Sequence, residues 1–162
     1  MMSKNIFESL HKQYYAMVHQ MCLGFVKGNH DAARDLSQEV FIIVWKKLET
    51  FREESSHKTW IYRITVNKCL EFIRKEKNKK TVPISDQEFG LKVENKEDQD
   101  VLISDLHRAI AQLKELDRLI IMMVLEGQGY EDISDVIGIN PVNTRVKIHR
   151  IKKRLKKILS NE

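Results

Sequence analysis

The sequence predicts an all-α protein of two small helical domains joined by a polar linker, the C-terminal one a helix-turn-helix. Three observations support this fold class. Apolar residues recur at helical spacing through most of the 162 residues, only two prolines interrupt them, and one polar strip separates two such regions. We expect the domains at residues 1–77 and 101–162 and the linker at residues 78–100.

Three helices are predicted in the first domain. The first spans about residues 6–26 and ends at Gly28 and Asn29, the second spans about residues 31–51, and the third about residues 58–77. Apolar side chains of the first helix recur every three or four residues and predict its buried face: Phe7, Leu10, Tyr14, Met17, Val18, Met21 and Phe25.

The second predicted helix places polar groups beside aromatic rings. Such a patch fits an interface that is anchored by rings and oriented by carboxylates. The spacing alone favours an ordinary amphipathic helix with its acids near the positive end of the helix dipole. The candidate interface residues are Asp35, Gln38, Glu39, Phe41 and Trp45.

The third predicted helix and the loop before it mix aromatic and cationic residues. Flat rings stack on unpaired bases and cations follow the phosphate backbone, so the mixture suits single-stranded DNA. Core aromatics beside solvated charges are the alternative. The rings are Phe51, Trp60, Tyr62 and Phe72, and the cations are Arg52, Lys58, Arg63, Lys68, Arg74 and Lys75.

The strip at residues 78–100 contains Pro83 and Gly90 and has few large apolar residues. It predicts an exposed linker, with a little structure near residues 82–89. Helical patterning resumes at Val101, and Asp117 is expected to cap a further helix at residues 118–126 that Gly127 closes.

The segment at residues 130–155 predicts a helix, a tight turn and a basic second helix. Gly138 suits the left-handed conformation that ends the first of these helices, Asn140 is expected to cap the second, and Pro141 fits its first position. This arrangement presents side chains to a DNA major groove. The core face of the second helix is expected at Thr144, Ile148, Ile151, Leu155 and Ile158.

Charge is concentrated in the same helix. The chain has a net charge of +5, and residues 145–157 hold eight Lys or Arg and no acid, which indicates phosphates as the counter-charge. Val142, Asn143, Val146, Lys147 and Arg150 lie largely off the core face, where such helices meet base edges.

Several other classes of protein are not indicated. No apolar run reaches the length of a membrane span, and the first residues lack a secretory signal, so we expect a cytoplasmic protein without membrane insertion. Cys22 and Cys69 lie in apolar helical patterns and predict buried thiols. His19 and Cys22 lack a second ligand pair, and no metal, cofactor or catalytic residue is expected.

The chain resembles bacterial sigma factors of the extracytoplasmic-function group, which direct RNA polymerase to promoters. The likeness covers about residues 7–158. Three segments carry it, in the family's order and spacing: DAARDLSQEVFIIVWKKL, TWIYRITVNKCLEFIRK and YEDISDVIGINPVNTRVKIHRIKKRL.

The resemblance implies three contact surfaces and no catalysis. The five residues of the second helix would dock on the clamp helices of the largest polymerase subunit. The loop at residues 51–57 and the third helix would read the minus-ten element and hold a flipped base, through Arg52, Ser55, Ser56, His57, Lys58, Tyr62, Arg63 and Asn67. The last helix would read the minus-thirty-five element through Val142, Asn143, Arg145, Val146, Lys147, His149 and Arg150.

The resemblance also implies partners: core RNA polymerase, including its flap, promoter DNA, and an anti-sigma factor that covers both domains. The linker would run towards the RNA exit path. The chain departs from the family at Val142, where a small residue is common, at Asn143, where threonine is common, at Thr144, where an apolar residue is common, and at His57, where an aromatic is frequent.

Two other functions stay open on the sequence. One is a helix-turn-helix regulator that binds duplex DNA without joining polymerase. The other is a metal-dependent nuclease, with Asp31, Asp35 and Glu39 at one-turn spacing as ligands.

Overall fold

The computed structural model describes residues 1–79 and 98–161, and the described part of the chain is helical and contains no strand. The prediction of an all-α fold is confirmed. Most of the expected linker, including residues 82–89, lies outside the described residues. The elements are α1 (Met2–Phe25), α2 (His30–Lys47), the short 3-10 helix η1 (Leu48–Thr50), α3 (His57–Lys79), α4 (Asp98–Ala111), α5 (Glu115–Leu125), α6 (Tyr130–Ile137) and α7 (Pro141–Ser160).

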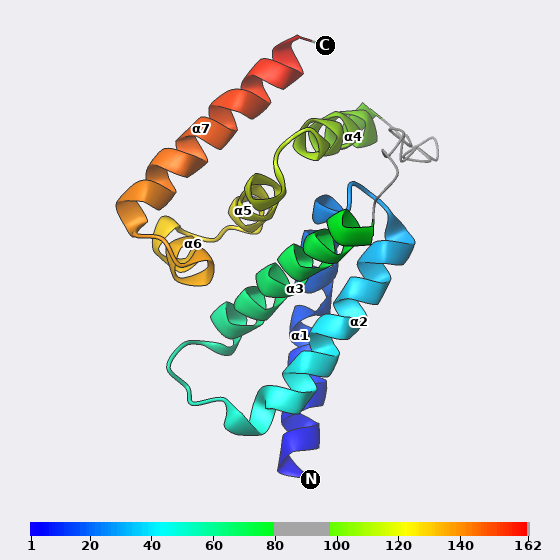
Figure 1. Ribbon diagram of the computed structural model, residues 1–162, viewed down its shortest axis with the longest axis vertical. Coiled ribbons are helices and arrows are strands. Elements are labelled where there is room, and N and C mark those ends of the chain that lie inside the picture. Colours follow the sequence, from blue (N-terminus) through cyan, green and yellow to red (C-terminus); the bar gives the residue numbers. More distant parts are fainter. Residues whose placement is uncertain (80–97, 162) are drawn as a thin grey trace.

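The first half is a bundle of α1, α2 and α3 (Figure 1). The turn between α1 and α2 follows from local chemistry: Gly28 has a φ of 85°, and its N–H donates to the carbonyl of Leu23 at 2.9 Å. Asn29 caps α2, because its side chain accepts from the N–H of Ala32 at 3.1 Å. The bundle therefore has two helices fixed antiparallel by a very short connection.

The second half contains α4 to α7, and here one capping prediction is wrong. Asp117 does not cap α5, because the N–H of Arg118 donates to the carbonyl of Lys114 at 3.0 Å, so the helix begins three residues earlier than expected. Asp117 lies inside the first helical turn, and its carboxylate pairs with the Lys147 ammonium at 3.2 Å. The residue thus connects α5 to α7.

The turn between α6 and α7 has the predicted construction. Gly138 is left-handed with a φ of 75°, the side chain of Asn140 accepts from the N–H of Asn143 at 2.8 Å, and α7 begins at Pro141. The buried face of α7 includes Thr144, whose hydroxyl donates to the carbonyl of Asn140 at 2.9 Å. Ile148, Ile151 and Leu155 are also buried and Ile158 is half-buried, so the predicted core face is confirmed.

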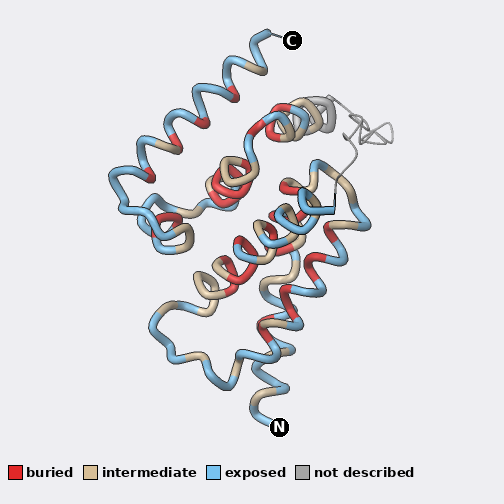
Figure 2. The backbone as a smooth tube through the Cα atoms, in the orientation of Figure 1, coloured by how far each residue is buried: buried red, intermediate tan, exposed pale blue. Residues whose placement is uncertain are grey.

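The two halves pack against each other. α5 lies on α1, and α6 lies on α3 (Figure 1). The buried residues of both halves form one continuous hydrophobic cluster, whereas most of α7 away from its inner face is exposed (Figure 2). The contact between the halves determines which of the candidate binding residues reach the surface.

Candidate nucleic-acid and protein interfaces

The outer face of α7 displays most of the predicted duplex-reading residues. Val142 is 72% exposed, and Asn143, Arg145, Val146, His149 and Arg150 are also on the surface. Lys147 is half-buried, and Asp117 holds its ammonium group. This face is therefore basic and rich in hydrogen-bond donors, with two exposed apolar side chains near the helix start, a combination that suits phosphates and base edges.

Tyr130 is a member of this surface that the sequence reasoning missed. Its ring, at the first position of α6, lies 5.2 Å from the guanidinium carbon of Arg145. A cation over an aromatic face is attracted by the ring quadrupole, so Tyr130 orients Arg145. The sequence feature that could have indicated this role is the position of Tyr130, an aromatic residue at the start of the helix that ends at Gly138. Together with Val146, Ile148, His149, Arg150 and Lys152, these two residues line a hollow of about 450 Å³.

The polar patch on α2 is exposed, but its two aromatic residues, Phe41 and Trp45, differ in exposure. Asp35, Gln38 and Glu39 are on the surface, and Trp45 is 48% exposed. Phe41 is only 4% exposed. The rings around it come from α1, and their centroid distances to Phe41 are 6.4 Å for Phe7, 4.7 Å for His11 and 6.0 Å for Tyr15.

Trp45 is the ring that this surface presents. Its indole meets the Phe7 ring edge to face at 5.2 Å between centroids. An aromatic held by a neighbouring ring and still half exposed suits an interface anchor, because little side-chain freedom is lost on binding. Phe41 is instead buried against the rings of α1.

Two acidic residues of α2, Asp31 and Glu39, form ion pairs. Asp31 pairs with Arg34 at 2.9 Å, and Glu39 pairs with Lys68 of α3 at 3.2 Å. Within residues 1–79 and 98–161 no group of three or more His, Cys, Asp or Glu side chains is placed to hold a metal ion. The arrangement of Asp31, Asp35 and Glu39 therefore gives no support to the nuclease hypothesis.

The loop before α3 forms an aromatic platform. Phe51 lies between His57 and Trp60, with ring centroids 4.8 and 4.7 Å away. The Ser56 hydroxyl accepts from the N–H of Thr59 at 3.1 Å at the start of α3. Rings in contact beside the exposed Arg52 fit the stacking of unpaired bases.

Two of the residues predicted to contact the minus-ten element, Tyr62 and Arg63, make contacts within the protein instead. Tyr62 is 1% exposed, and burial together with the Glu126 carboxylate raises the pKa of its phenol. The Nε of Arg63 donates to the carbonyl of Asp135, in α6, at 3.0 Å. Lys58 is half-buried and Asn67 is exposed. The packing of the halves thus covers part of the α3 face that the sequence assigned to DNA.

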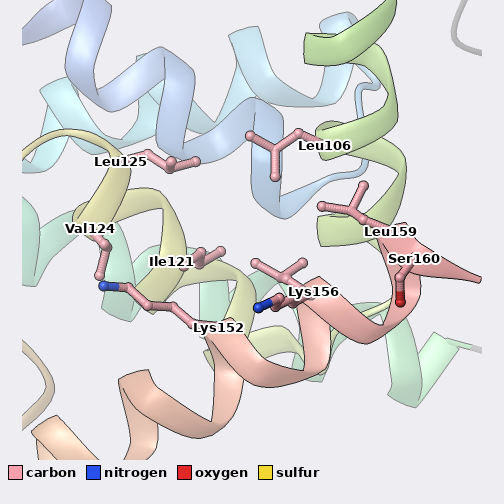
Figure 3. Close-up of a pocket in the computed structure, with 9 residues that line it drawn as sticks. Leu106, Ile121, Val124, Leu125, Lys152, Lys156, Leu159 and Ser160 are labelled. Atoms are coloured by element: carbon pink, nitrogen blue, oxygen red, sulfur yellow. The ribbon is translucent and has the colours of Figure 1, made fainter.

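An apolar groove of about 550 Å³ opens between α4, α5 and α7 (Figure 3). Two ammonium groups, those of Lys152 and Lys156, lie at its edge. The groove suits an apolar segment accompanied by acidic residues. Its apolar side chains are Leu106, Ile121, Val124, Leu125, Leu155 and Leu159.

Both thiols are buried, as predicted. Cys22 and Cys69 are each 0% exposed. The hydrogen bond that the Cys69 thiol donates to Cys22, together with burial, raises the pKa of the Cys69 thiol. The helices of the described residues contain no segment both long and apolar enough to cross a membrane.

Two family models match this chain, one in each half. The family model described as Sigma-70 region 2 matches residues 10–79, and the one described as Sigma-70, region 4 matches residues 103–155. The RNA polymerase sigma-H factor of Pseudomonas aeruginosa is 30% identical over 171 residues, which cover 96% of this chain and 87% of that protein. The sigma factor SigV of Bacillus subtilis is 28% identical over 153 residues, with 94% and 88% covered.

A solved structure has the same fold across both halves. It is the sigma factor RpoE in complex with the anti-sigma factor NepR from Bartonella quintana, with a TM-score of 0.75 and 21% identity. The match covers 95% of this chain and 96% of that chain. The shared fold therefore includes both helical halves.

Proposed function

The chain belongs to the sigma factors of the extracytoplasmic-function group, and we propose that it binds core RNA polymerase and directs it to promoters through two separate DNA contacts. One observation carries this proposal beyond the family assignment. A single chain combines an exposed, basic helix-turn-helix with a second half that has both an acidic-aromatic patch and an aromatic-cationic loop. A regulator that only binds duplex DNA needs the first surface and not the other two.

The polymerase contact is assigned to the exposed side of α2. Trp45 supplies the apolar anchor, and Asp35, Gln38 and Glu39 surround it with acceptors for cationic or amide partners on the clamp helices. Phe41 acts as a positioning residue, because its buried ring packs against Phe7, which in turn contacts Trp45. The contact therefore depends on α1 as well as α2.

The groove between α4, α5 and α7 is assigned to the flap of the polymerase. Its apolar floor and the lysines at its edge favour an apolar segment with acidic neighbours. Two polymerase contacts on different halves would hold the two DNA-binding surfaces at a fixed spacing. That spacing is what two promoter elements require.

The first test removes the α2 carboxylates. Asp35→Ala with Glu39→Ala is expected to abolish association with core polymerase while leaving binding of the α7 surface to duplex DNA unchanged, because the two surfaces lie on different halves. Association is measured by gel filtration with core polymerase. Asp31→Ala, an exposed acid in the first turn of the same helix, is the matched control and should bind normally.

The Asp35→Ala, Glu39→Ala variant also distinguishes a sigma factor from a helix-turn-helix regulator that acts without polymerase. A helix-turn-helix regulator acting alone would keep full activity in cells without these carboxylates. If the double variant still activates transcription and binds core as the unmodified chain does, the polymerase contact is assigned to the wrong surface.

The upstream DNA contact is assigned to α7. Arg150 is exposed on its outer face, and an arginine placed on base edges discriminates between base pairs. Val142 and Asn143 lie exposed at the helix start, where they meet the groove first. These two residues depart from the family pattern and are the ones expected to choose the promoter.

A second prediction concerns Arg150. Arg150→Ala is expected to weaken binding to the minus-thirty-five element by about 1–3 kcal/mol and to relax the base preference at one position. Arg154→Ala, an exposed cation one turn further along α7, is expected only to reduce the salt dependence, since a phosphate contact carries no sequence information. Fluorescence anisotropy with single-base variants of the element, at several salt concentrations, distinguishes the two. Equal losses on every sequence would contradict base reading by Arg150.

The downstream contact is assigned to the loop at residues 51–57 and the start of α3. The Phe51, His57 and Trp60 rings offer a stacking surface, and Arg52, Ser55, Ser56 and Lys58 offer phosphate and base-edge contacts. Asn67 continues this surface along α3, whereas Tyr62 is buried and Arg63 is bonded to Asp135 of α6 in this structure. An anti-sigma factor is the further partner we propose, and it would compete with the polymerase for both halves.

A further inference from the structure

We propose that Val142 and Val146, two exposed valines of α7, select the promoter by contacting the methyl groups of two thymines in the upstream element. The inference rests on the proposed function, because it names the base that the α7 surface would read. Each valine would contact one methyl group in the major groove. The position of the valines on the helix, the charges around them and the contacts of their neighbours support this assignment.

Both valines lie on the side of α7 that faces away from the core. An α-helix has about 3.6 residues per turn, so positions 142 and 146 share one face, roughly opposite the buried Ile148 and Ile151. Val142 is 72% exposed and Val146 is 43% exposed. The two side chains therefore form a short apolar strip at the centre of the outward face, in the first two turns of the helix.

The strip lies in a surface that is otherwise cationic. Every other exposed residue between positions 145 and 157 is Lys, Arg or His. Valine has a lower helix propensity than lysine or arginine, and an apolar side chain gains nothing by facing water. A cation at position 146 would therefore suit a helix that only attracts phosphates. The valine indicates that the middle of this face meets an apolar group.

Contacts with other helices hold the two cations beside Val146 at the sides of this face. The guanidinium carbon of Arg145 lies 5.2 Å from the centre of the Tyr130 ring in α6. The ammonium of Lys147 pairs with the Asp117 carboxylate in α5 at 3.2 Å. The flanking cations are thus drawn towards different helices, and Val146 remains between them. Because a recognition helix meets phosphates at its sides and base edges at its centre, this arrangement directs the valine to base edges.

Thymine supplies the apolar group that such a strip can contact. In the major groove thymine alone carries a methyl group, at C5, beside the donors and acceptors that all four bases present. Valine is stiff about χ1, so little side-chain freedom is lost when it is fixed against a base. Asn143, exposed beside the strip, carries an amide of the kind that pairs with adenine, the partner of thymine in the duplex.

The strip is separate from the apolar groove assigned to the flap. The part of α7 that lines that groove begins at Lys152 and ends at Ser160, and neither valine belongs to it. Val146 instead lines the hollow that contains Tyr130 and Arg145. A protein segment bound in the groove would therefore leave the strip free for DNA.

The spacing of the valines predicts the spacing of the thymines. Residues four positions apart in a helix are separated by about 6 Å along its axis. Stacked base pairs are separated by about 3.4 Å along the duplex. We therefore expect the two thymines in base pairs that are adjacent or separated by one pair, on either strand of the upstream element.

Replacing thymidine by deoxyuridine removes only the methyl group and tests the inference directly. Duplexes with a randomised upstream element are first selected with the full chain and core polymerase, and core polymerase alone is the control. Each thymidine of the most enriched element is then replaced in turn, and binding is measured by competition. Replacement at two positions with the predicted spacing is expected to weaken binding by about three- to fivefold each, whereas replacement elsewhere should have no effect.

Matched variants assign each methyl group to its valine. Val146→Ala should bind the thymine and uracil forms equally at one of the two positions and keep the loss at the other, and Val142→Ala should show the reverse. Both residues are exposed, so the helix content in circular dichroism should stay unchanged. Lys153→Ala, an exposed cation on the same face, is the control, and it should weaken binding to all duplexes alike and keep both losses.

Two results would overturn the inference. One is an enriched element in which no replacement of thymine by uracil weakens binding. The other is a pair of uracil losses that persist unchanged in both valine variants. A failure of the proposed function gives a different result, because the chain would then enrich no sequence beyond those that core polymerase alone retains.

Discussion

Replacing Phe25 by alanine is expected to lower the free energy of unfolding by about 3–5 kcal/mol. Phe25 is 1% exposed, closes the end of α1, and gives its ring face to the Arg118 guanidinium. The substitution removes a large buried ring and leaves a cavity beside a buried cation. Both losses act at the contact between the halves, so the cooperativity of unfolding should fall with the stability.

Urea unfolding followed by circular dichroism measures this effect. Met2→Ala, a large apolar residue on the same helix that is 79% exposed, is the control and should change the stability by less than about 0.5 kcal/mol. A Phe25→Ala protein as stable as the control would contradict the position of Phe25 at the centre of the core.

The second large effect is expected at Trp45. Trp45→Ala should weaken the complex with core polymerase by about 2 kcal/mol or more, roughly thirtyfold, because a half-exposed indole held against Phe7 has the properties of an interface hot spot. The folding stability should change much less, since about half of the side chain is already in water.

Titration of labelled core polymerase measures this affinity. Trp45→Phe retains a ring against Phe7 and should recover part of the binding, whereas Lys46→Ala, an exposed neighbour outside the assigned patch, should bind normally. If Trp45→Ala binds core as tightly as Lys46→Ala does, Trp45 is not the anchor of the polymerase contact.

The features that were predicted correctly depend on neighbours in sequence. The turn at Gly138, Asn140 and Pro141 is such a case, because each residue acts on backbone groups within four positions. The buried face of α7 follows from its spacing in the same way. The cap at Asp117 was wrong because several residues near it are compatible with a helix start, and the bond from Arg118 to Lys114 decides between them.

The features that the sequence did not reveal depend on distant parts of the chain. Phe41 and Trp45 occupy similar positions in the helical pattern of α2, yet rings of α1 bury one and leave the other half exposed. Tyr62 and Arg63 belong to the face of α3 on which aromatic and cationic residues alternate, and this sequence pattern does not show which of them are buried. The packing of α6 and of the end of α5 determines their exposure. Tyr130 was missed for the same reason, since its partner Arg145 lies in the next helix.

Above all, we expect this chain to give core RNA polymerase its promoter specificity. The most direct measurement combines the purified chain with core polymerase on genomic DNA fragments and maps the 5′ ends of the transcripts. We expect discrete start sites that core polymerase alone does not use, each preceded by a shared pair of sequence elements. The same set of ends with and without the chain would contradict this expectation.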